Sequence, residues 1–187
     1  EIASGAAAQM TLSFCQANEH FIVPSTAYLN GLCRALNNAV VAENKKIKFG
    51  RMGTTMVSLY FLVDQVYVCN VGDSRAFRLR DNELLQLSTD HVEHLPPQSK
   101  HKPGLTQYIG IDPDEMVIEP FIAKGNLKRG DQYLICSDGI TDMLTNIEIC
   151  ATLKNHASTG VAVRKLVELA MDHGGRDNIT AILCRIR

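Results

Sequence analysis

The sequence has no long hydrophobic run and no strong imbalance of charge. Its longest apolar stretch is MVSLYFLV at residues 56–63, which has the length of a strand, whereas a membrane-spanning helix needs about 20 apolar residues. The net charge is −1, and no run of like charges stands out. A nucleic-acid or membrane-surface partner is therefore disfavoured, and we expect no membrane span.

The cysteines lack the pattern of a disulfide framework. There are 6 of them, none in a CxxC pair, and each lies in an apolar or helical context such as VYVCNV or YLICSD. Disulfide-rich folds are usually smaller, loop-rich and secreted. We expect buried free thiols, as in proteins of the reducing cytoplasm.

Apolar periodicity and capping residues predict four helices. The first covers residues 2–18, and the second follows Pro24 and Ser25. The third starts at a Thr145/Glu148 capping box, and the fourth follows Ser158. Two N-terminal stripes are expected to face the core, namely Ile2, Ala6, Met10 and Phe14 in the first helix and Tyr28, Leu29, Leu32, Leu36 and Val40 in the second.

Strand-like segments occupy most of the remaining chain. Asp81 and Asn82 join two of them as a hairpin, and residues 91–104 form a Pro-rich loop. Short turns between strands favour antiparallel pairing, with the helix pairs covering two sheet faces, so the fold class is α+β. The predicted strands are MVSLYFLV, QVYVCNV, RAFRLR, ELLQLS, MVIEPFI, DQYLICS and NITAILCRI.

An aspartate follows or precedes three of these strands, beside small residues. Asp73 follows QVYVCNV, Asp138 follows DQYLIC, and Asp177 stands before NITAILCRI. If the last two strands are antiparallel neighbours, Asp138 and Asp177 lie side by side. Carboxylates without a Cys or His cluster favour magnesium or manganese over zinc.

Other interpretations of these residues remain open. Each aspartate could simply stabilise a turn, so the spacing alone makes a divalent-metal site one interpretation among several. Zinc at His91, His94 and His101 is a further possibility, but their irregular spacing in one loop favours solvated side chains.

Five motifs in a fixed order resemble the protein phosphatase 2C family of metal-dependent serine/threonine phosphatases, and they lean towards its bacterial members. The resemblance implies a four-layer sandwich of two antiparallel sheets flanked by helix pairs, in one domain over residues 1–187. The motifs are MGTT (52–55), VGDSR (71–75), STDH (88–91), LICSDGITD (134–142) and GGRDNIT (174–180).

The resemblance also implies site residues and cofactors. Asp138 and Asp177 match ligands of a centre with two Mn²⁺ or Mg²⁺ ions, and Asp73, with Asp138 and Asp142, matches a third, weaker metal site. A metal-activated water, rather than a side chain, would hydrolyse phosphoserine or phosphothreonine. Structural positions near the site are Gly53, Thr54, Gly139 and Asn178.

The family's first acidic Asp-Gly motif, whose aspartate bridges the two metals, has no counterpart in the sequence. We therefore expect further strands to precede the chain, and the fold as given to be incomplete at its N-terminus. Expected partners of a monomeric enzyme are phosphoproteins and a serine/threonine kinase or its targets. The alternatives are a catalytically inactive binding or regulatory module of the same fold and an unrelated magnesium-dependent hydrolase.

Overall fold

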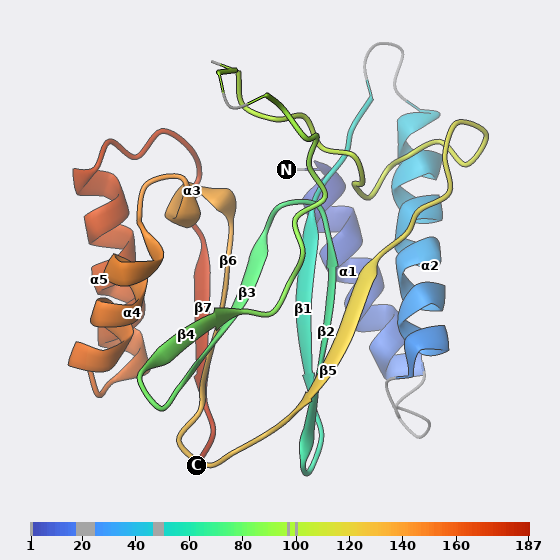
Figure 1. The fold of residues 1–187 in the computed structure, drawn as a ribbon. Coiled ribbons are helices and arrows are strands. Elements are labelled where there is room, and N and C mark those ends of the chain that lie inside the picture. The colour runs from blue at the N-terminus through green and yellow to red at the C-terminus, as the bar shows by residue number, and fades with distance from the viewer. Residues whose placement is uncertain (1, 18–24, 47–50, 97, 100) are drawn as a thin grey trace. The chain divides into compact units, whose positions relative to one another are not determined.

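Helices α1 (Ile2–Ala17) and α2 (Thr26–Asn44) lie side by side in the computed structural model (Figure 1). The structure describes residues 2–17, 25–46, 51–96, 98–99 and 101–187. Ser25 begins α2 as predicted, because its Oγ accepts a hydrogen bond from the Tyr28 N–H. Both N-terminal helices are thus confirmed.

The apolar stripe predicted for α1 is wrong. Ile2 is 65% exposed, whereas Ala3 and Ala7 are buried. Small side chains let two helices approach closely, so α1 buries its alanine face rather than its larger residues. Phe14 of the predicted stripe does pack against α2, because its ring centroid lies 5.3 Å from that of Tyr28. In α2 the predicted stripe is confirmed at its buried leucines and at Val40.

The strands form two antiparallel sheets flanked by helices, which confirms the α+β class. Asp81 and Asn82 have φ values of 49° and 69°, the left-handed conformation that a tight hairpin turn requires. One sheet has the order β1-β2-β5, and its strands are β1 (Met56–Phe61), β2 (Gln65–Val71) and β5 (Phe121–Asn126). The other has the order β4-β3-β6-β7, with β3 (Arg75–Arg80), β4 (Glu83–Gln86), β6 (Gln132–Cys136) and β7 (Ala181–Arg185).

One predicted strand begins later than expected, and one short helix was not predicted. The strand expected in MVIEPFI begins only at Phe121, because Pro120 cannot donate a backbone hydrogen bond to a sheet. Between β6 and the next helix, the chain forms a one-turn helix, α3 (Asp138–Thr141). A single turn is too short to produce a helical repeat in the sequence, so it was not predicted.

The chain divides into two compact units. The first comprises Glu1–Met56, Cys69–Gly72 and Asp90–Ile122, and the second comprises Val57–Val68, Asp73–Thr89 and Ala123–Arg187. The single domain expected from the sequence stays a prediction. No helix within the described ranges is both long and apolar enough to cross a bilayer.

The core of the second unit lies between the β4-β3-β6-β7 sheet and a helix pair (Figure 1). Its helices are α4 (Asn146–Asn155), which has the predicted capping box, and α5 (Thr159–Asp172). Phe77 and Leu134 of the sheet meet Leu153 and Leu166 of the helices, all fully buried. This packing holds the helix pair against one face of the sheet.

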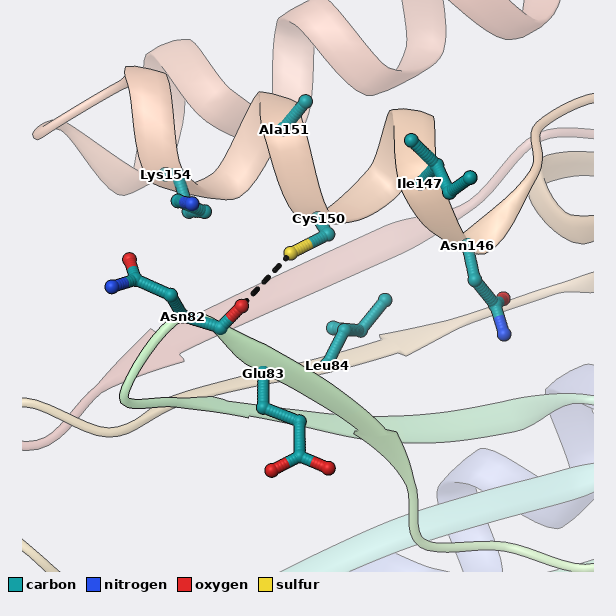
Figure 2. Close-up of a pocket in the computed structure, with 8 residues that line it drawn as sticks. All are labelled: Asn82, Glu83, Leu84, Asn146, Ile147, Cys150, Ala151 and Lys154. Carbon is teal, nitrogen blue, oxygen red and sulfur yellow. Dashed lines mark hydrogen bonds between the residues drawn. The ribbon is translucent and has the colours of Figure 1, made fainter.

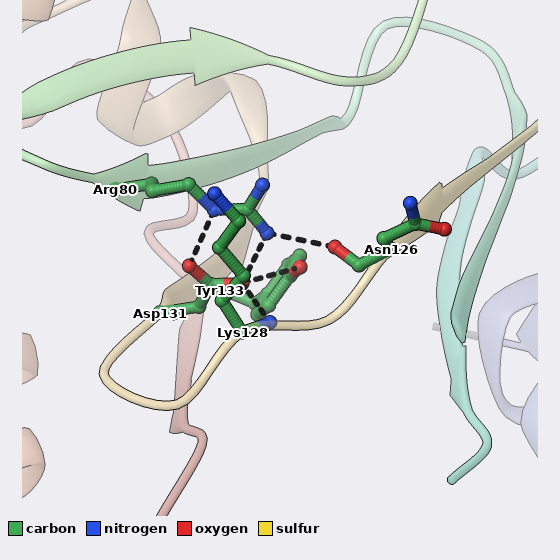
Figure 3. Close-up of polar contacts among 5 residues, drawn as sticks. All are labelled: Arg80, Asn126, Lys128, Asp131 and Tyr133. Carbon is green, nitrogen blue, oxygen red and sulfur yellow. Dashed lines mark hydrogen bonds and ion pairs between the residues drawn. The ribbon is translucent and has the colours of Figure 1, made fainter. Parts of the chain in front are cut away.

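A buried ion pair links the end of β3 to the start of β6 (Figure 3). Arg80 donates from Nε to Asp131 Oδ1 over 2.7 Å and from Nη2 to Asp131 Oδ2 over 2.6 Å. The same carboxylate accepts hydrogen bonds from the Lys128 N–H and the Tyr133 hydroxyl. Arg80 Nη2 also donates to the Asn126 carbonyl, so the connection between β5 and β6 is tied to β3.

These contacts shift two pKa values. Burial raises the pKa of Asp131, but the hydrogen bonds from Arg80, Lys128 and Tyr133 outweigh it and leave the pKa below its usual range. Burial, reinforced by the neighbouring Asp131 carboxylate, raises the pKa of Tyr133 to about 12. The carboxylate is therefore charged and the hydroxyl protonated near neutral pH.

We predict that Asp131→Asn lowers the free energy of unfolding by about 3–5 kcal/mol, because it leaves the Arg80 guanidinium largely buried without its counter-charge. Chemical denaturation would measure the loss. The exposed pair Lys165–Glu168, 3.3 Å apart, provides the control: Glu168→Gln should cost less than about 1 kcal/mol. Equal losses in both variants would show that the buried pair has no special role.

The Asp131→Asn effect should depend on pH. A carboxylate whose pKa is lower in the folded state stabilises the fold above its unfolded pKa of about 3.9, and this contribution is lost as the pH falls through the folded value. The difference between wild type and variant should be constant from pH 5 to 7 and shrink below about pH 4. A difference that grows on acidification would contradict this assignment.

Candidate functional site

Three candidate aspartates lie beyond the same end of the β4-β3-β6-β7 sheet. Arg75, the first residue of β3, is opposite Cys136, the last residue of β6. Cys136 is in turn opposite Ala181, the first residue of β7. Asp73 precedes β3, Asp138 follows β6, and Asp177 precedes β7. The predicted antiparallel pairing of the last two strands is confirmed, and we call this end of the sheet the acidic edge.

A close backbone approach joins β6 and β7 at the acidic edge. A Cβ atom added to Gly139 would lie 2.4 Å from the Asn178 carbonyl oxygen, so any larger residue would push the two segments apart. The Ser137 hydroxyl donates to the same carbonyl over 3.1 Å and accepts from the Thr180 N–H over 3.0 Å. The segments bearing Asp138 and Asp177 are thereby held together.

Ser137 was not among the residues singled out from the sequence. Its signal was its place between a strand end and Asp138, where a short hydroxyl side chain can bond both to its own segment and to its neighbour. Gly139 and Asn178 were predicted as structural positions near the site, and their mutual contact gives each a physical role. The metal-binding role of the neighbouring aspartates stays a prediction.

The one-turn helix α3 relates Asp142 to Asp138. The Asp142 N–H donates to the Asp138 carbonyl over 2.7 Å, and the two residues begin and cap the same turn. Residues four apart on a helix lie on the same side. This spacing is compatible with Asp142 as a further ligand, and its side chain is exposed.

Asp177 also stabilises its own turn. Its Oδ1 accepts the Asn178 N–H over 2.7 Å, and the two preceding glycines, Gly174 and Gly175, have φ values of 124° and 49°. Glycine adopts this left-handed conformation without steric cost. This hydrogen bond supports the local turn interpretation of Asp177 and uses one of its two carboxylate oxygens.

The backbone that enters Asp73 is fixed by two reciprocal hydrogen bonds. The Gly72 N–H donates to His91 Nδ1 over 3.2 Å, and the His91 N–H donates to the Gly72 carbonyl over 3.1 Å. Burial lowers the pKa of His91, which suits a ring nitrogen that accepts a hydrogen bond. His91 is thus not the solvated loop side chain expected from the sequence. Gly72 has a φ of 101°, and an added Cβ would lie 2.4 Å from Thr55 Cγ2.

The MGTT motif packs within the first compact unit. A Cβ on Gly53 would lie 2.6 Å from the Tyr108 ring, and Thr54 forms an isolated antiparallel bridge with Ile109. The contact with Tyr108 explains why a glycine occurs at position 53. The acidic edge belongs to the second unit, so the predicted role of Gly53 and Thr54 near the site stays a prediction.

The donors at the acidic edge match a divalent cation in kind. All are carboxylates, the hard oxygen ligands that magnesium and manganese prefer. Within the residues that the structure describes, however, no three side chains of the His, Cys, Asp or Glu type are gathered as a metal site. At the acidic edge, aspartates therefore lie at the ends of neighbouring strands, but three of them are not gathered as ligands around one point.

Comparison with known sequences decides the family. The sequence profile described as "Protein phosphatase 2C" matches residues 1–169. The chain belongs to the protein phosphatase 2C family. Among the curated relatives, PstP of Mycobacterium tuberculosis is 28% identical over 169 residues, which cover 86% of this chain and 33% of PstP. PhpP of Streptococcus pneumoniae is 33% identical over 160 residues, 75% of this chain and 64% of PhpP.

The chain therefore spans less than two thirds of each of these relatives. Solved structures of family members agree with its fold. A serine/threonine phosphatase of Streptococcus agalactiae has a TM-score of 0.85 and 25% identity, covering 100% of this chain and 83% of that one. The PstP catalytic domain in complex with 2 manganese ions has a TM-score of 0.78 and 26% identity, covering 97% and 81% of the two chains.

We predict that Gly139→Ala separates the segments at the acidic edge and lowers the free energy of unfolding by about 1–3 kcal/mol, the usual cost of overpacking. Thermal unfolding would measure it. The control is Gly160→Ala in α5, where the nearest atom to an added Cβ is 4.0 Å away and the helix should be unchanged or slightly stabilised. An unaffected Gly139→Ala variant would contradict the tight backbone contact.

Proposed function

We propose that this chain forms the catalytic part of a metal-dependent protein phosphatase acting on phosphoserine and phosphothreonine monoesters. The observation that carries the proposal is the placement of Asp73, Asp138 and Asp177 beyond one end of a single sheet, in a member of the 2C family. The PstP catalytic domain in complex with 2 manganese ions supports the same cofactor here.

In this proposal, Asp138 and Asp177 hold two Mn²⁺ or Mg²⁺ ions, and Asp73, Asp138 and Asp142 hold a third, weaker one. When bound, such ions activate water and offset the charge of the phosphoryl oxygens. The chain itself positions the carboxylates, through the Gly139 contact and the Ser137 hydrogen bonds. No side chain of the chain serves as nucleophile.

The remaining roles follow from the same assignment. The substrates are phosphoproteins, and a serine/threonine kinase or its targets are the partners of a monomeric enzyme. A single phosphatase 2C-like domain over residues 1–187 includes Gly53 and Thr54 as structural positions near the site. A cytoplasmic location is supported by the cysteines, all of which are free thiols, as is usual in a reducing compartment.

The proposal predicts manganese-dependent hydrolysis of a phosphothreonine peptide by the full-length protein. Asp177→Ala should lower kcat/KM by more than the roughly 10–100-fold loss typical of changes around a metal site, because it removes a ligand outright. Release of inorganic phosphate would measure turnover. Asp172→Ala, an exposed aspartate at the end of α5, is the matched control and should retain activity.

Two results would reject the mechanism. One is activity that persists in Asp177→Ala, and the other is activity that persists in excess chelator. If the wild-type protein binds manganese but hydrolyses no phosphopeptide, the catalytically inactive module becomes the correct interpretation.

A further inference from the structure

A groove of about 450 Å³ lies between helix α4 and strand β4, within the second compact unit. Figure 2 shows α4 above the groove and the hairpin of β3 and β4 below it. Asp73 precedes the start of β3, whereas Asn82 of the groove follows its end. The groove therefore lies at the other end of β3 from the acidic edge, so binding in it can be separated from hydrolysis.

One face of α4 forms the upper wall. Ile147, Cys150 and Lys154 are spaced three and four residues apart, so they lie along one side of the helix and all line the groove. The opposite side of α4 carries Ile149 and Leu153, which are fully buried in the core. Ile147 is 81% exposed, so core packing does not explain a large apolar residue at this position.

Strand β4 forms the lower wall and ends its sheet. Leu84 points towards Ile147 across the groove (Figure 2). In the sheet order, β4 has β3 as its one neighbour among the described strands. Every second residue of an edge strand directs its N–H and C=O away from its neighbour, which makes it a template for one more strand. A helix beside such an edge is the arrangement in which extended peptides bind by adding a strand.

The lining of the groove includes one cation, Lys154, and one anion, Glu83. Lys154 forms no ion pair with any residue that the structure describes. The Glu83 carboxylate points away from α4 in Figure 2, and Asp81 lines a neighbouring hollow that Lys154 also borders. A ligand that crosses the groove therefore meets apolar walls at Leu84 and Ile147 and the Lys154 ammonium group at the hairpin end.

We propose that the groove binds an extended segment of a partner protein, which adds a strand to β4. An apolar side chain of the segment fits between Leu84 and Ile147, and an acidic side chain pairs with Lys154. Lys154 lies seven positions after Ile147 on the helix, about 10 Å along the axis, or roughly three residues of extended chain. Because successive side chains of a strand point to opposite faces, two side chains that face α4 are an even number of residues apart. The acidic residue therefore lies two or four residues from the apolar residue.

The probe is the capped peptide Glu-Thr-Ile-Thr-Val-Thr-Glu, which offers both spacings in either chain direction. Calorimetry with the full-length protein should show saturable binding. Lys154→Glu should weaken it about fivefold to tenfold, as expected for loss and reversal of an exposed charge pair, and Ile147→Asp should weaken it further. Lys165→Glu on α5 is the matched control and should bind as wild type. Thermal unfolding verifies that each variant folds.

Cysteine alkylation gives a second readout that locates the peptide. Cys150 lines the groove, whereas Cys184 lies on β7, and both are partly exposed. The peptide should slow alkylation of Cys150, followed by mass spectrometry, and leave Cys184 unchanged.

Three outcomes would overturn the proposal. The first is no saturable binding at millimolar peptide, and the second is binding that neither Ile147→Asp nor Lys154→Glu weakens. In the third, Ile147→Asp dissociates a dimer seen by sedimentation, so that the occupant of the groove is a second copy of the chain.

Discussion

The register of three neighbouring strands determines where the candidate ligands lie. Because β3, β6 and β7 are antiparallel and paired end to end, their acidic junctions all fall beyond one end of the sheet. A shift by one residue would turn every side chain of a strand to the other face and displace its aspartate. The Gly139 contact and the Ser137 hydrogen bonds prevent such a shift between β6 and β7.

The opposite end of the same strands is fixed by different chemistry. Arg80 and Asp131 form a buried ion pair where β3 ends and β6 begins, and the core beneath α4 and α5 holds the middle. The sheet is thus anchored at one end by charge and at the other by backbone contact. Asp131 thus stabilises the fold at the end of the strands that lies opposite the acidic edge.

Local patterns predicted most elements, whereas the contacts of the site came only from the structure. Ser25 and the Thr145/Glu148 capping box gave correct helix starts because caps act within one turn. The prediction of the core face of α1 was wrong because this face is determined by packing against α2. Small alanine side chains allow the close approach, and the sequence of α1 alone does not reveal it. Convergence of the aspartates could be anticipated from strand ends, but the Gly72–His91 pair joins residues 19 apart in sequence, and no local pattern reveals such a partner.

The most direct test of the account is a manganese titration of the protein, followed by electron paramagnetic resonance of the free ion. The account predicts saturable binding that is strongly weakened by Asp138→Asn and by Asp177→Asn. It should be unchanged by Asp81→Asn, which removes a carboxylate at the opposite end of β3. Manganese binding that is unaffected by both substitutions at the acidic edge would contradict the central claim that these strand ends form the metal site.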